Sequence, residues 1–273
     1  MISKKLYVDT ANLDAISDIW DKICNKNKNL VDVIGITTNP NAFYKLGKNK
    51  LSEWMEILPR LCDKLSKIRK DDQGIVYVQC PSCEMSIGEV YDYVDLLLSL
   101  NCSGAKIGLK IPPYDNILKY SKGLSKHIDL NVTGLSDCST ALKCVNYGVK
   151  VVSIIPGRME EVGIDAKAHV SYLVNSIKGS CRSNQHVIAG SMRTVDGVKW
   201  TVDFGTVPTI GEKVWALLFN DNNFETTFSD KESSLINTRF SPFCSEVNLN
   251  LSLAFFKQMD ECGKQAYLDF KNK

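Results

Sequence analysis

The chain has 273 residues, of which 44% are hydrophobic and 23% charged, a composition typical of globular proteins that bury one substantial core. A formal net charge of +2 gives no reason to expect a polyanionic partner, so we do not expect nucleic-acid binding. The longest apolar stretch, around residues 94–100, is too short to cross a bilayer, and the first residues lack a signal-peptide pattern. We therefore expect a cytoplasmic protein without a membrane partner.

Ten cysteines in a cytoplasmic protein are expected to be reduced. Cys80 and Cys83 have the spacing of a zinc or redox pair, but a zinc site needs a second pair of ligands. None of His127, His169 and His186 supplies one at a matching spacing. We expect no bound metal.

Short apolar runs rich in β-branched residues alternate with segments of helical period along residues 6–219. This alternation predicts a parallel sheet with crossover helices. Eight such units predict an α/β fold, a (β/α)8 TIM barrel that forms a catalytic domain over residues 1–220. The predicted strands are Leu6–Thr10, Val31–Thr38, Ile75–Cys80, Ala105–Ile111, Leu130–Leu135, Val149–Ile155, His186–Met192 and Thr206–Ile210. The predicted helices include Leu13–Cys24, Ser52–Ile68, Ile87–Leu100, Ile117–His127, Thr140–Tyr147, Ala166–Ile177 and Gly211–Phe219.

Residues 221–273 follow the eighth unit. They begin as a polar stretch and end in a helix-like pattern that includes Leu251, Phe255 and Met259. We expect a C-terminal helical extension that packs on the barrel, covering its mouth, or on a neighbouring subunit, and the sequence does not choose between these. We expect the protein to form a homo-oligomer.

Lys110 lies inside an apolar, strand-like run, residues 106–112. A buried lysine is either paired or used in chemistry. Burial lowers the pKa of an amine, so a lysine on a barrel strand can supply the free amine that forms a Schiff base with a carbonyl. The alternative is that Lys110 faces solvent at a strand end or pairs with a carboxylate.

In a (β/α)8 barrel the chemistry lies at the carboxyl ends of the strands. Asp9 ends the first run, where it serves as a general acid/base or only as a helix N-cap. The second run ends in Thr37 and Asn39, which place a hydroxyl and an amide at the mouth or only form an Asn-Pro turn. Gln79 ends the third run.

Further polar residues follow on the later strands. Asn131 and Thr133 are two apart on the fifth run, so both point inward together, and Ser153 lies on the sixth. Arg158 follows the sixth run, and Ser191 and Arg193 are predicted on one face of the seventh. Each arginine alone is typical of a surface ion pair, but two arginines after strands six and seven can clamp a phosphate. Together these residues predict a sugar-phosphate site.

Six stretches in order give the chain a resemblance to the transaldolase family, including its fructose-6-phosphate aldolases, over roughly residues 6–218. They are Leu6-Tyr7-Val8-Asp9-Thr10-Ala11-Asn12, Gly35-Ile36-Thr37-Thr38-Asn39-Pro40, Lys110-Ile111-Pro112, Asn131-Val132-Thr133, Gly157-Arg158 and Ala189-Gly190-Ser191-Met192-Arg193. Each stretch alone is a weak signal, but six at strand ends are specific.

The resemblance implies that Lys110 forms the Schiff base, that Asp9 transfers a proton and that Thr133 helps to place a catalytic water. It implies contacts with the keto-sugar portion from Asn39, Asn131 and Ser153. It implies contacts with the phosphate from Arg158, Ser191 and Arg193. Such an enzyme acts in carbohydrate metabolism, in the pentose phosphate pathway, and needs no cofactor because the iminium is the electron sink.

The chain departs from the family pattern in the segment after Thr133, where Gly134-Leu135-Ser136-Asp137 replaces an apolar-Phe-Ser pattern, and at two single positions. Gln79 stands where transaldolases have a Glu that works with the water. Fructose-6-phosphate aldolases have Gln there, but they use a Tyr where this chain has Ile155. Tyr77 and Tyr114 are the candidates to replace that hydroxyl.

Three functions stay open from the sequence. The favoured prediction is a transaldolase that transfers a dihydroxyacetone unit from fructose 6-phosphate or sedoheptulose 7-phosphate to an aldose phosphate. The second is a lyase of the fructose-6-phosphate aldolase type. The third is a barrel subunit that binds sugar phosphate without turning it over.

Overall fold

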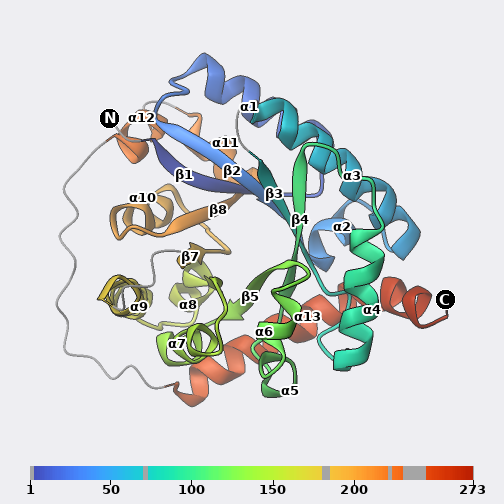
Figure 1. Cartoon of the computed structure of the whole chain (residues 1–273). Helices are drawn as coiled ribbons and strands as arrows, with labels where there is room; N and C mark the ends of the chain where they lie inside the picture. Colours follow the sequence, from blue (N-terminus) through green and yellow to red (C-terminus); the bar gives the residue numbers. More distant parts are fainter. Residues whose placement is uncertain (1–2, 70–72, 180–184, 221–222, 230–243, 273) are drawn as a thin grey trace.

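The computed structural model describes residues 3–69, 73–179, 185–220, 223–229 and 244–272. Eight parallel strands pair in chain order, and the last pairs with the first to close a barrel surrounded by helices (Figure 1). This confirms the predicted (β/α)8 barrel. The strands are β1 (Lys4–Asp9), β2 (Val31–Thr37), β3 (Gly74–Gln79), β4 (Ala105–Ile111), β5 (Asp129–Leu135), β6 (Val151–Ile154), β7 (His186–Ala189) and β8 (Val207–Gly211).

Six crossover helices lie where the periodicity predicts them, and most carry an apolar face that packs on the sheet. They are α1 (Leu13–Asn25), α3 (Leu51–Ile68), α4 (Ile87–Leu98), α7 (Cys138–Asn146), α9 (Ala166–Gly179) and α11 (Glu212–Leu218). The helix predicted at Ile117–His127 is instead two short helices, α5 (Asp115–Leu118) and α6 (Ser121–Leu124). The continuous prediction was wrong because the buried residues of the two short helices keep a helical spacing across the break between them.

Four further helices were not predicted, and their sequences explain why. They are α2 (Pro40–Lys45), α8 (Pro156–Glu161), α10 (Val195–Asp203) and α12 (Asn223–Phe228). Three of them have six residues, too few to show a helical period. The fourth, α10, contains Gly197 and several valines, which have low helix propensity, and it begins at the N-cap Thr194, whose side chain accepts from Gly197 N at 3.0 Å.

Side chains that point into the barrel form an apolar layer below a polar layer. The lower layer, nearer the amino ends of the strands, consists of Tyr7, Tyr77, Val151 and Ile188. Two residues further along a strand the side chain points the same way. The residues that follow at that spacing on β1, β3 and β6 are Asp9, Gln79 and Ser153. Polar groups therefore collect inside the barrel at the carboxyl ends of its strands.

The C-terminal helix α13 (Glu246–Lys271) runs from the side of β5 and α8 to the side of α2 and α3 (Figure 1). Its Phe255, Phe256 and Met259 form one buried apolar cluster with Cys83 and Ile155 at the mouth of the barrel. The helix thus packs on the barrel of its own chain, while the homo-oligomer stays a prediction.

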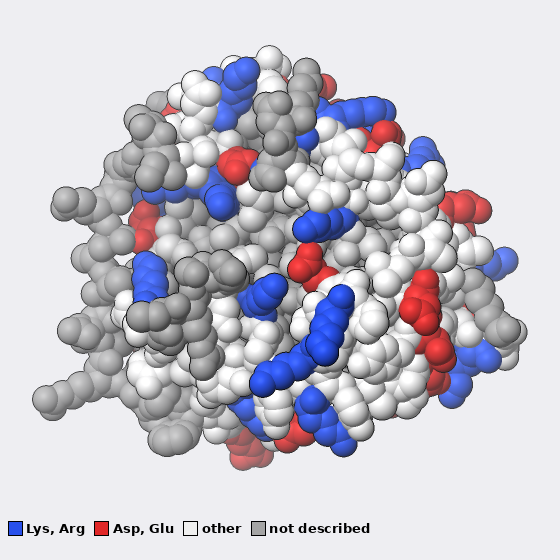
Figure 2. Space-filling model, viewed as in Figure 1, with Lys and Arg blue, Asp and Glu red and all other residues white. Residues whose placement is uncertain are grey.

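Basic and acidic side chains of the described residues are interspersed over the face in Figure 2. Within the described part of the chain, no helix combines the length and apolar character needed to span a membrane. None of the nine described cysteines forms a disulfide. No group of three His, Cys, Asp or Glu among the described residues could hold a metal ion.

Candidate active site

Lys110 lies on β4 with its side chain inside the barrel and only 6% exposed. Its neighbours across the sheet are Gln79 on β3 and Asn131 on β5, and its Nζ donates a hydrogen bond to the Thr38 carbonyl at 3.2 Å. Burial lowers the pKa of Lys110, and the Asp9 charge offsets part of this shift. The alternative in which Lys110 faces solvent is therefore wrong, and its amine has the environment of a nucleophile.

Asp9 ends β1 and is held by a chain of two threonine hydroxyls. Thr37 Oγ1 donates to Asp9 Oδ1 at 2.8 Å, and the hydroxyl oxygens of Thr37 and Thr209 are 2.6 Å apart. Because Thr37 uses its proton on Asp9, Thr209 donates to Thr37. The N-cap of α1 is Asn12, whose Oδ1 accepts from Asp14 N at 3.1 Å. The alternative in which Asp9 only caps this helix is therefore wrong.

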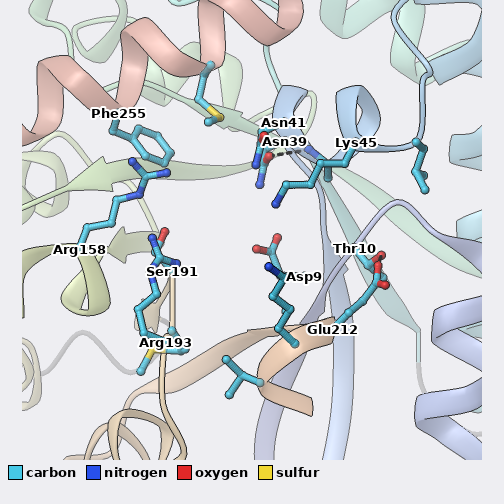
Figure 3. Close-up of a pocket in the computed structure, with 17 residues that line it drawn as sticks. Asp9, Thr10, Asn39, Asn41, Lys45, Arg158, Ser191, Arg193, Glu212 and Phe255 are labelled. Atoms are coloured by element: carbon cyan, nitrogen blue, oxygen red, sulfur yellow. Dashed lines mark hydrogen bonds between the residues drawn. The ribbon is translucent and has the colours of Figure 1, made fainter. Parts of the chain in front are cut away.

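Asn39 both caps a helix and faces the mouth of the barrel. Its Oδ1 accepts from Ala42 N at 3.0 Å, and Pro40 occupies the first turn of α2, the arrangement that an Asn-Pro sequence favours. The rest of the Asn39 amide points into the space between the strand ends, as Figure 3 shows. Both interpretations of this residue are thus compatible.

Buried amides lie on both sides of Lys110. Ser153 Oγ donates to Asn131 Oδ1 at 2.8 Å, and Thr133, on the same strand as Asn131, is 3% exposed. Among the described residues, no group pairs with Asn131 Nδ2 or with either amide atom of Gln79, although all three atoms are buried. Buried polar groups normally have partners, so these atoms offer two donors and an acceptor to a polar ligand beside Lys110.

The short helix α8, which follows β6, and the loop after β7 bring Arg158 and Arg193 together. Gly157 is so close to this loop that a Cβ on it would lie 2.1 Å from Ser191 O. Ser191 has φ 54°, a left-handed conformation uncommon outside glycine. Because β7 ends at Ala189, the prediction that Ser191 and Arg193 share one strand face is wrong. Both residues lie in the loop and still line the same cavity as Arg158.

The two arginines have different partners. Arg193 Nε donates to Glu161 Oε1 at 2.6 Å in a partly exposed ion pair. Arg158 Nη2 donates to the neutral Gln258 Oε1 at 2.7 Å, and its guanidinium lies over the Phe255 ring, 5.1 Å from the centroid. Burial and then the charge of Arg193 lower the pKa of Arg158, which Glu161 partly offsets. A bound anion would stabilise this pair of neighbouring cations.

A cavity of about 420 Å³ lies at the mouth of the barrel. Figure 3 shows Arg158, Arg193 and Ser191 on one side of it, Asp9 near the centre and Lys45 across from the arginines. Of the predicted site residues, those that line it are Asp9, Asn39, Arg158, Ser191 and Arg193. Those that are buried in the barrel outside this lining are Thr37, Gln79, Lys110, Asn131, Thr133 and Ser153. Asp9 links the two groups because it lines the cavity and its charge acts on Lys110.

A family model described as transaldolase/fructose-6-phosphate aldolase matches residues 6–251. The chain belongs to this family. Proteins named probable transaldolase are similar to it: one from Bartonella henselae is 27% identical over 210 residues, which cover 75% of this chain and 85% of that protein. One from Nitrosopumilus maritimus is 28% identical over 209 residues, 75% and 83% of the two chains. One from Methanococcus maripaludis is 26% identical over 237 residues, 85% and 99% of the two chains.

The position where the aldolases of this transaldolase family use a Tyr is apolar here. Ile155 is 2% exposed within the cluster formed with α13. Tyr114 packs on that cluster, with its ring 5.5 Å from the ring of Phe256, and burial raises its pKa to about 12. Tyr77 belongs to the lower layer of the barrel interior. Neither tyrosine is among the described residues that line the cavity.

Several cavity residues were missed by the reasoning from sequence. They are Thr10, Asn41, Lys45, Glu212, Lys213, Phe255 and Met259. Glu212 follows directly after β8 and accepts a hydrogen bond from Thr10 Oγ1 at 2.5 Å, so the strand-end rule could have found it had the last strand been extended by one residue. Phe255 and Met259 had no comparable signal, because the sequence left open whether the C-terminal helix packs on this barrel or on a neighbouring subunit.

Proposed function

We propose that this member of the transaldolase family is a transaldolase that transfers a dihydroxyacetone unit through a Schiff base on Lys110. The donor is fructose 6-phosphate or sedoheptulose 7-phosphate, and the acceptor is an aldose phosphate. The observation that carries the proposal is the buried Lys110 amine. Burial lowers its pKa, and the charge of Asp9 offsets part of this shift. Such an amine is a competent nucleophile toward a ketone.

The reaction begins when Lys110 Nζ attacks the C2 carbonyl of the ketose, and loss of water gives an iminium. Asp9 accepts the C4 hydroxyl proton, the C3–C4 bond breaks, and its electron pair forms an enamine with the iminium nitrogen as the sink. An aldose phosphate leaves. The enamine C3 then attacks the acceptor aldehyde, Asp9 returns the proton to the new hydroxyl, and hydrolysis of the new iminium frees Lys110.

The remaining site residues hold the two ends of the substrate. Thr37 orients Asp9 through the hydrogen bond at 2.8 Å. The three-carbon unit is held by Asn39, Asn131 and Ser153. The phosphate is held by Arg158, Ser191 and Arg193, at the loops where barrels often bind phosphate. Gln79 and Thr133 place the water that hydrolyses the iminium.

A second candidate is a lyase of the fructose-6-phosphate aldolase type, and one observation favours it. The direct neighbour of Lys110 on β3 is Gln79, a neutral amide, where transaldolases have a Glu. In a lyase the enamine is protonated at C3, and hydrolysis of the iminium releases dihydroxyacetone.

The experiment that separates these functions is acceptor dependence. A transaldolase consumes fructose 6-phosphate only when an aldose phosphate such as erythrose 4-phosphate is present, whereas a lyase consumes it alone. A barrel that only binds the sugar phosphate does neither but is stabilised by it against thermal unfolding. Lys110→Met, tested beside the unsubstituted protein, should abolish consumption in either catalytic case.

A further inference from the structure

We propose that Gln258 on α13 is a positioning residue that holds Arg158 in place to bind the phosphate of the substrate. The C-terminal helix would then be part of the phosphate site. This inference rests on the proposed function for the nature of the ligand, a phosphate group.

Two contacts from the same helix fix the Arg158 guanidinium. The Gln258 amide oxygen accepts from Arg158 Nη2 at 2.7 Å, which sets the direction of the group. The Phe255 ring also contacts the guanidinium, with 5.1 Å between the ring centroid and Arg158 Cζ. Among the described residues, no group pairs with the buried Arg158 Nε. The orientation of this side chain therefore depends on α13.

A neutral hydrogen-bond partner prepares Arg158 to bind phosphate better than a negatively charged partner would. Arg193 already forms an ion pair with the Glu161 carboxylate at 2.6 Å. A bound anion would have to compete with Glu161 for the Arg193 guanidinium. Gln258 holds Arg158 by a hydrogen bond without cancelling its positive charge. A phosphate that reaches the cavity then meets one arginine whose hydrogen-bond partner is neutral.

The helix is docked firmly enough to fix the position of Gln258 beside Arg158. Asp260 Oδ1, two residues beyond Gln258, accepts from Cys83 N at 2.6 Å. A turn later, Gly263 lies so close to the loop after β3 that a Cβ on it would be 1.9 Å from Pro81 O. Phe255, on the other side of Gln258, is 5% exposed. Gln258 is thus flanked by fixed contacts on both sides.

The direct test is binding of inorganic phosphate, measured by titration calorimetry, to the unsubstituted chain, Gln258→Ala and Gln258→Glu. We expect about tenfold weaker binding for Gln258→Ala, the usual effect of losing a hydrogen bond to a charged group. Gln258→Glu keeps the size of the side chain but adds a carboxylate to Arg158, so its binding should be weaker still. Gln265→Ala is the matched control, since Gln265 is an exposed residue of α13 whose side chain, among the described residues, donates a hydrogen bond to Asp269 at 2.8 Å.

Activity gives a second readout that a merely structural role would not produce. With phosphorylated substrates, Gln258→Ala should raise KM about tenfold and leave kcat within about twofold. With unphosphorylated glyceraldehyde as acceptor, the acceptor KM should match that of the unsubstituted chain.

The outcomes separate this inference from the proposed function. Equal phosphate binding by Gln258→Ala and the unsubstituted chain would overturn the inference alone, as would an equal loss in Gln265→Ala. If the unsubstituted chain binds no phosphate, the inference and the proposed phosphate site both fail. Schiff-base formation on Lys110 is measured separately and does not depend on this result.

Discussion

Gln79 and Lys110 are direct neighbours on the parallel strands β3 and β4, and both side chains are buried inside the barrel. Burial is the largest influence on the pKa of Lys110, and Asp9 is the charge that raises it. Gln79 adds no second negative charge beside the amine, which leaves the lowered pKa that attack on a ketone requires.

Introducing a carboxylate at this position should slow imine formation at neutral pH. In Gln79→Glu the new negative charge would raise the pKa of Lys110. The pH at which imine formation reaches half of its maximal rate should therefore be higher than in the unsubstituted chain. At pH 7 we expect a roughly tenfold slower rate, equivalent to about one pKa unit. Borohydride-quenched time courses across pH measure this. An unchanged midpoint would contradict the assigned proximity, and Gln79→Met serves as the uncharged control.

Removing the Asp9 carboxylate should stop turnover without preventing attachment of the substrate. In Asp9→Asn we expect kcat to fall about 10²- to 10⁴-fold, the usual contribution of a general acid/base. The pKa of Lys110 should also fall, because Asp9 is the charge that raises it. Steady-state kinetics measure the fall in kcat, and mass spectrometry after borohydride trapping should detect a ketose adduct on Lys110 whose C3–C4 bond is intact. Full activity of this variant would eliminate the assigned role.

Docking of α13 should be sensitive to a single methyl group at Gly263. Because a Cβ there would lie 1.9 Å from the Pro81 carbonyl oxygen, Gly263→Ala must displace the helix, and we expect a destabilisation of about 1–3 kcal/mol. Gly88→Ala is the control, since its Cβ would meet only Ser86 Oγ at 4.0 Å and alanine stabilises a helix by about 0.5–1 kcal/mol. Thermal unfolding compares the two, and equal unfolding temperatures would argue against tight docking.

Protonation of His186 should destabilise the fold in acid. Burial, followed by the charge of Lys5, lowers its pKa to about 4, and the Tyr7 hydroxyl lies 3.2 Å from its Nε2. In the unfolded chain the pKa returns to about 6.5, so the unfolded state binds the proton more readily. Stability is therefore lost as pH falls from about 6.5 to about 4, by up to about 3 kcal/mol.

Urea unfolding at a series of pH values measures that loss. His186→Gln should flatten the dependence in this interval, because it removes the titrating group. If the free energy of unfolding of His186→Gln fell with pH as steeply as that of the unsubstituted chain, other groups would be responsible for the loss.

Most of the barrel could be predicted because each strand is a short buried run with its own local signal. Lys110 stood out because a cation interrupts such a run, and Asp9 and Asn39 because they follow one. The hydroxyl chain from Thr209 through Thr37 to Asp9 could not be predicted, since β8 meets β1 and β2 only after the barrel closes.

The contact between Arg158 and Gln258 was beyond the sequence for a similar reason. The two residues are 100 positions apart, and their pairing depends on the path of α13 across the mouth. The sequence indicated a helix there but left open whether it covers this barrel or another subunit.

The central claim is a Schiff base on Lys110, and trapping tests it most directly. The protein is incubated with fructose 6-phosphate, reduced with borohydride and digested, and the modified peptide is located by mass spectrometry. We predict a reduced three-carbon adduct on Lys110, absent in Lys110→Met. A folded protein that gives no adduct on Lys110 with either fructose 6-phosphate or sedoheptulose 7-phosphate would contradict the account.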